Sequence, residues 1–187
     1  ISHATRSSGM HITLSEPRHV KKEPVSVMSF PKTPRLTRWI IAAAVAAAGA
    51  ATMVVILVIL GDLEDDGAVM IVSAALGAGL AGLLFAGMFG RMERKRDWGF
   101  FALGAVLATS LGSFLGGAIW GVMLVIFKAA PSDEFLPVVI LKMGGFGFMV
   151  VMFLMPTEQP GTVAVWVLIM LSAQAVSVWA RRYRTAA

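Results

Sequence analysis

The chain has 187 residues, of which 57% are hydrophobic and only 14% are charged, and its mean hydropathy is +0.78. Soluble globular proteins are about 25% charged, so this composition excludes an ordinary soluble domain and predicts an all-α, polytopic membrane protein. The net charge is +5, and the chain contains no Cys, which excludes disulfides, thiol nucleophiles and Cys-ligated metal centres. Because the basic residues flank apolar runs, we expect contact with a lipid bilayer and none with nucleic acid.

Residues 1–38 are predicted to form a disordered, basic tail on the cytoplasmic side. They contain four of the eight prolines and show no sustained apolar period. The chain opens with Ile1, and one hypothesis is that the native start is Met28, which would make residues 1–27 non-native or upstream of the true start. All three histidines lie in this tail, eight residues apart, a pattern that predicts solvated side chains rather than a metal site.

Five apolar runs follow, and a short basic tail, 181–187, ends the chain. The runs are residues 39–60, 68–90, 98–127, 136–155 and 162–180. A hydrocarbon core of about 30 Å needs about 20 helical residues, and lipid leaves no water to satisfy exposed backbone groups, so we expect a transmembrane helical bundle. The third run would be about 45 Å long as a helix at about 1.5 Å per residue, so it has to tilt, protrude or break.

The charges of the connecting segments predict a cytoplasmic N-terminus, because basic residues stay inside. With five crossings, eleven basic residues lie inside and four outside. Five crossings, however, place Arg181, Arg182 and Arg184 outside. We expect five crossings; the alternative, four crossings with a re-entrant segment at 136–155, would return these arginines to the inside.

Small residues recur every four positions in the second and third runs. Residues four apart share one helix face, and a face of small residues lets two membrane helices pack closely. We therefore predict close packing of these two helices, within one chain or between copies. The stripes consist of Ala74, Ala78, Gly82, Ala86 and Gly90 in the second run, and of Gly104, Ala108, Gly112, Gly116, Ala105, Thr109, Ser113, Gly117 and Gly121 in the third.

Lys142 and Gln174 are the candidate polar sites inside the apolar runs. Lys142 is the only ionisable residue well inside a run, and intramembrane charge is expensive and often functional. Three interpretations stay open: an anchor whose side chain reaches back to the surface, a structural ion pair with Asp133 or Glu134, and a contact for an anion or substrate. The three glycines that follow Lys142 could unwind a transporter helix or serve close packing.

The apolar runs lack the residues that most membrane enzymes and pumps need. They contain no His, Asp or Glu, which argues against a His-ligated haem and against a carboxylate proton relay. The chain also lacks the motifs of hydrolases, P-loop proteins and zinc proteases. We therefore expect no catalytic residue, no cofactor and no metal.

The segment between the second and third runs is the main basic cluster outside the tail. Arg91, Arg94, Lys95 and Arg96 form either a topogenic cluster, a headgroup patch or a docking surface for a partner. The sequence favours a non-catalytic subunit or assembly partner of a larger membrane complex, in a bacterial inner membrane, that associates with a partner or with itself through Gly/Ala helix faces. The alternative is a small transporter or channel component for an ion or small solute.

Overall fold

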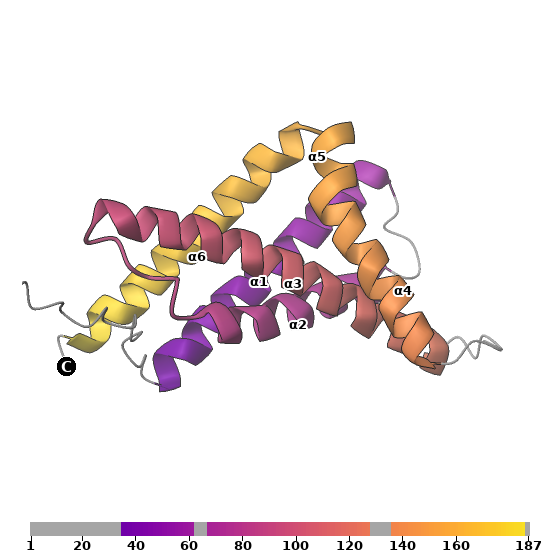
Figure 1. Cartoon of the computed structure of the whole chain (residues 1–187), viewed down its shortest axis with the longest axis horizontal. Coiled ribbons are helices and arrows are strands. Elements are labelled where there is room, and N and C mark those ends of the chain that lie inside the picture. Colours follow the sequence, from indigo (N-terminus) through magenta and orange to yellow (C-terminus); the bar gives the residue numbers. More distant parts are fainter. Residues whose placement is uncertain (1–34, 62–66, 128–135, 186–187) are drawn as a thin grey trace, which may run out of the picture. The chain divides into compact units, whose positions relative to one another are not determined.

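The computed structural model describes residues 35–61, 67–127 and 136–185, all of which belong to the unit Pro31–Ala187. The predicted tail before Arg35 lies outside this part of the chain, as do Asp133 and Glu134. Every element in the described part is helical, and five helices are long and apolar enough to cross a membrane, which confirms the predicted helical class. The elements are α1 (Arg35–Leu60), α2 (Gly67–Phe85), α3 (Lys95–Phe127), α4 (Leu136–Met149), η1 (Val150–Leu154), α5 (Met155–Glu158) and α6 (Gly161–Thr185), as Figure 1 shows.

Several helix boundaries differ from those of the apolar runs, including the start of α1 and the end of α2. Helix α1 begins at Arg35, four residues inside the predicted tail, because Thr37 is buried and the Arg38 guanidinium donates a hydrogen bond of 3.2 Å to the Leu83 carbonyl. Helix α2 ends at Phe85, although its apolar run continues to Gly90. Residues 86–94 therefore form a connection between α2 and α3, and most of its apolar residues are packed against the bundle.

Helices α1, α2 and α3 pack as an antiparallel layer through small residues. Gly49 of α1 lies against Ala74 and Ala78 of α2, and a side chain at Gly77 would collide with the backbone of Gly116 in α3. The helix axes approach closely because the interface atoms are backbone and methyl groups. Such close packing is expected in lipid, where the hydrophobic effect does not drive helices together. The small-residue faces of α2 and α3 therefore meet within one chain.

The alternating directions of these helices create two distinct ends of the bundle. The N-terminus of α1, the C-terminus of α2 and the N-terminus of α3 meet at one end, and the C-terminal part of α6 joins them there. We call this the basic end, and the other the opposite end. The basic end carries many of the Lys and Arg residues in the described part of the chain, among them Arg35, Arg38, Arg91, Arg94, Lys95, Arg96, Arg181 and Arg182.

The continuous helix from α4 to α5 begins near the opposite end and runs antiparallel to α3, so that Met152 contacts Ser110 in the middle of α3. Val139 and Met143 lie against Gly121, six residues before the end of α3, and Met155 lines a cavity together with Ile56, four residues before the end of α1. Its last part widens into the π-helix η1, where the Met155 N–H bonds the Val150 carbonyl. Pro156 follows directly and has no N–H for an α-helical bond, which explains a local change of helical pitch here.

Helix α6 then packs against α1 and runs antiparallel to it, from the opposite end back to the basic end (Figure 1). Around the bundle, large apolar side chains stay exposed on all five long helices, for example Val58, Leu84 and Leu168. So much exposed apolar surface is unfavourable in water. The fold therefore agrees with the composition in indicating a protein surrounded by hydrocarbon.

Candidate functional site

The most polar interior contact joins the α2–α3 connection to α6 through Gln174. This side chain is 0% exposed; its Oε1 accepts a hydrogen bond of 2.8 Å from the Gly90 N–H, and its Nε2 donates one of 3.1 Å to the Arg91 carbonyl. In an apolar surrounding, an unpaired backbone group is costly. Gln174 thus satisfies both backbone groups where the connection has left the helical hydrogen-bond pattern.

Arg181 completes the same contact about two turns further along α6. Its Nε donates to the Phe89 carbonyl at 2.8 Å, and one terminal nitrogen donates to the Ala86 carbonyl at 2.9 Å. The last carbonyls of a helix lack partners within the helix, and basic side chains commonly bind them. Arg181 therefore acts as a C-terminal cap for α2, donated by a helix far away in sequence.

Gly90 is the point at which the connection touches α6. Its φ of +78° lies in the left-handed region, which favours glycine. A Cβ at this position would come within 2.6 Å of both the Arg181 Nε and the Ser177 carbonyl. Only glycine fits here without displacing the contact between Arg181 and the end of α2.

Phe89 anchors the connection in the core on its other side. Its ring is fully buried and meets the Phe101 ring of α3 edge-on, with centroids 6.0 Å apart. Such aromatic pairs add about 0.5–1.5 kcal/mol beyond the burial of area. We define the polar clamp as Gly90, Gln174 and Arg181 with the backbone groups that they bind.

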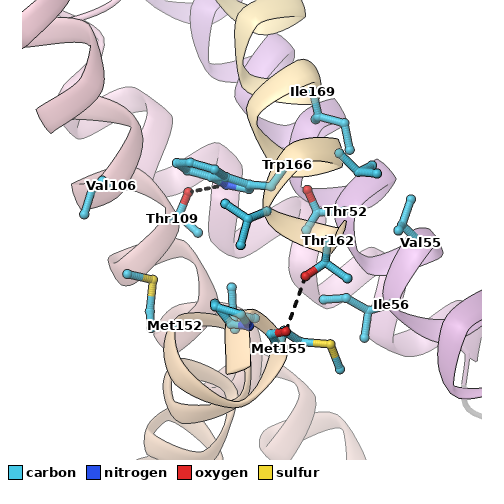
Figure 2. A pocket seen from close by; sticks show the side chains of 14 residues that line it. Thr52, Val55, Ile56, Val106, Thr109, Met152, Met155, Thr162, Trp166 and Ile169 are labelled. Atoms are coloured by element: carbon cyan, nitrogen blue, oxygen red, sulfur yellow. Dashed lines mark hydrogen bonds between the residues drawn. The ribbon is translucent and has the colours of Figure 1, made fainter. Parts of the chain in front are cut away.

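Two neighbouring apolar cavities lie near the opposite end, between α1, α3, η1 and α6. Their volumes are about 420 Å³ and 260 Å³, and both are lined by Thr52, Ile56, Thr109, Val151, Met155 and Trp166. Figure 2 shows the smaller one, where the Trp166 indole N–H donates a hydrogen bond of 3.1 Å to the Thr109 hydroxyl. This bond links α6 to α3 at the wall that both cavities share.

The hydroxyl groups around these cavities are largely used by the chain itself. Thr52 donates to the Ala48 carbonyl at 2.8 Å, and Thr162 donates to the Gln159 carbonyl at 2.7 Å. Figure 2 also shows the longer contact from Thr162 to the Met155 carbonyl. The cavities are therefore suited to an apolar occupant rather than to a hydrated ion.

Lys142 lies on the exposed side of α4, away from both the polar clamp and the cavities. It stands six residues after the start of α4. Its predicted partners, Asp133 and Glu134, fall outside the described residues. The structure thus separates the two predicted polar positions, with Gln174 deep in the bundle and Lys142 on its surface.

The predicted small-residue positions occupy several different contacts. Ala74 and Ala78 meet Gly112 and Gly116 between α2 and α3, whereas Gly82 lies against Val45 of α1. Gly117 and Gly121 face α4, and Gly104 faces Met88 of the connection. Ala86 and Gly90, expected on the second helix, lie beyond its end in the connection, because α2 stops at Phe85. Ala108 is buried and lines the larger cavity.

Sequence reasoning missed the role of Arg181 and the bond between Trp166 and Thr109. Arg181 was interpreted only as a topogenic charge. One available signal was the spacing of Gln174, Ser177 and Arg181, which places three polar residues on one face of an apolar helix. Ser177 is fully buried and bonds the Ala173 carbonyl, so this face points into the bundle.

The described residues contain no group of three or more His, Cys, Asp and Glu that could hold a metal ion. Of the basic cluster, Arg91 is half-buried, and Arg94, Lys95 and Arg96 are exposed at the basic end.

Comparison of the chain with protein families, curated proteins and solved structures finds no match.

Proposed function

We propose that this chain is a non-catalytic subunit of a larger membrane complex and that it binds a transmembrane helix of its partner beside α6. The interior polar groups of the clamp support this proposal, because they bond the chain's own backbone and hold its helices together. A side chain used in this way is not available to a substrate. A subunit that binds its partner through α6 needs this helix to be held rigidly, and the polar clamp holds it.

The single observation that carries the proposal is the smaller cavity beside the half of α6 that lies toward the opposite end. Several apolar side chains of this half stay exposed, including Val163, Val165 and Leu168. Val163 and Val165 also line the cavity, whose wall continues through Trp166 to η1. A bilayer does not leave such a recess empty, and a partner helix with a bulky apolar side chain would fill it.

A transporter or channel has less support. Its pathway would need polar groups aimed into a continuous cavity. Both cavities are lined mainly by apolar side chains, and Lys142 lies on the surface away from them. The two cavities therefore favour contact with a hydrophobic partner over passage of an ion.

For the topology, we propose four crossings by α1, α2, α3 and α6, with the continuous helix Leu136–Glu158 lying obliquely against α3 without crossing. This helix starts at the opposite end beside Gly121 and reaches Ser110 in the middle of α3, and α6 then runs to the basic end. This arrangement also removes the conflict with the positive-inside rule. The basic end, with the N-terminus of α1, would then face the cytoplasm of a bacterial cell, in its inner membrane.

Site-specific photo-crosslinking tests the partner proposal. A photoreactive residue at Val163, which lines the cavity and is exposed, should crosslink to one defined partner in native membranes, whereas the same residue at Leu80 serves as a matched control, because Leu80 is exposed on α2. Mass spectrometry of the crosslinked band identifies the second chain. Crosslinks to lipid alone from both positions, with no co-purifying chain in gentle detergent, would contradict the proposal.

A further inference from the structure

Two arginines at the basic end carry positive charge without a carboxylate partner among the residues that the structure describes. Arg181 of α6 and Arg91 of the connection lie close enough for their guanidinium groups to repel each other. Their positions are fixed by the polar clamp, because Gln174 binds the Arg91 carbonyl and Arg181 binds the Phe89 carbonyl. The clamp thus holds the Arg91 main chain and the Arg181 guanidinium in place and keeps the two positive charges in one region of the fold.

Arg91 has a donor that the described chain leaves unused. Its Nη2 atom is buried and has no hydrogen-bond partner. A buried guanidinium donor without an acceptor is costly, and planar guanidinium groups bind phosphate and carboxylate oxygens well. An anion placed against Arg91 would accept this hydrogen bond and offset the repulsion from Arg181.

The nearby acidic side chains do not fill this role. Asp97 and Glu93 are the acidic residues near the start of α3 in the described part of the chain. Asp97 Oδ2 accepts hydrogen bonds from the backbone N–H groups of Glu93 and Arg94, at 3.1 and 2.8 Å, and so caps the first turn of α3. Within the described residues, neither carboxylate forms an ion pair with Arg91 or Arg181.

Aromatic side chains place these arginines at the level of lipid headgroups. Trp39, Trp98, Trp179 and Tyr183 lie in the terminal turns of α1, α3 and α6 at the basic end, and each is at least half exposed. Exposed Trp and Tyr side chains of membrane proteins concentrate where hydrocarbon gives way to headgroups. The anion most accessible to Arg91 at this depth is the phosphate of a phospholipid.

We propose that Arg91 and Arg181 form a binding site for the phosphate group of an anionic phospholipid in the leaflet at the basic end. Arg91 supplies the free donor, and Arg181 supplies a second positive charge while it caps α2. This site goes beyond the partner-binding role and is independent of it. It depends only on the basic end lying at a membrane surface.

The test compares lipid binding by Arg91→Gln and Arg94→Gln in detergent solution. Both changes remove one positive charge from the same segment, but Arg94 is exposed and serves as the matched control. Gln174 binds the main-chain carbonyl of residue 91, so the polar clamp survives the change of side chain. Native mass spectrometry or thermal shift would measure binding of phosphatidylglycerol, phosphatidylcholine and inorganic phosphate.

We expect phosphatidylglycerol to bind and to raise Tm, with about tenfold weaker binding in Arg91→Gln and less than about twofold in Arg94→Gln. Without lipid, Arg91→Gln should be as stable as the unchanged protein or more stable, because a repulsive charge is gone. Equal losses in both variants would overturn the proposal, since they indicate diffuse attraction. Stabilisation by inorganic phosphate but not by phosphatidylglycerol would overturn the lipid assignment and leave a site for free phosphate.

Discussion

Gln174 shows how one polar side chain can determine an interhelical contact in an apolar bundle. It satisfies one N–H and one carbonyl of the α2–α3 connection, and it has no exposed surface. In water, either backbone group could bond to solvent after a substitution. In hydrocarbon no water is available to form this hydrogen bond, so the unpaired backbone group destabilises the folded state.

We therefore predict that Gln174→Leu lowers the free energy of unfolding by about 1–2 kcal/mol, because it leaves the Gly90 N–H and the Arg91 carbonyl without partners. Thermal unfolding in detergent measures the change. Ser172→Ala is the control, since Ser172 is exposed and bonds only the Leu168 carbonyl of its own helix. If the two variants have the same Tm, the account of Gln174 is wrong.

At the scale of elements, the close packing of α2 against α3 depends on positions that have no room for a side chain. A Cβ at Gly112 would lie 3.0 Å from the Ala78 Cα, whereas nothing lies within 4 Å of one at Gly99 on the same helix. The neighbour at Gly112 is backbone and cannot rotate away. The two glycines of α3 therefore have different roles.

We expect Gly112→Leu to destabilise the bundle by about 1–3 kcal/mol through overpacking, and Gly99→Leu to have little effect. Thermal stability of both variants in detergent tests this difference. Equal stability of Gly112→Leu and the unchanged protein would contradict the packing of α2 on α3 described above.

The sequence predicts elements better than it predicts how they meet. Five apolar runs indicate five long helices, because length and hydropathy are local properties, and the helices are present. The end of α2 at Phe85 could not be predicted, since the apolar run continues through Phe89 and Gly90. The helix ends where Arg181 binds the carbonyls of Ala86 and Phe89, which precede it by 95 and 92 residues in the sequence. No local sequence pattern indicates this contact.

The polar clamp could be predicted only in part, again because its contacts join residues far apart in the sequence. Gln174 stands out as an amide inside an apolar run, so the sequence marks it as a candidate. Its partners are backbone groups of Gly90 and Arg91, which any residue type would offer. Pairing of this kind depends on tertiary structure and leaves no signature in the identity of the residues.

At the scale of the whole molecule, the proposed topology depends on where α6 ends. Arg181 reaches the C-terminus of α2, so the last helix ends beside the basic connection. A reporter fused to the C-terminus should therefore be active as a cytoplasmic fluorescent protein and inactive as a periplasmic alkaline phosphatase. The opposite pair of activities would support five crossings.

The most direct test of the four-crossing arrangement uses the turn between α5 and α6. Because the chain has no Cys, the single substitution Gln159→Cys introduces one thiol at an exposed position, and Arg94→Cys introduces one at the basic end. The measurement is labelling by a membrane-impermeant maleimide in spheroplasts before and after permeabilisation. We predict that Gln159→Cys reacts at once and that Arg94→Cys reacts only after permeabilisation; protection of both thiols until the membrane is opened would contradict the account.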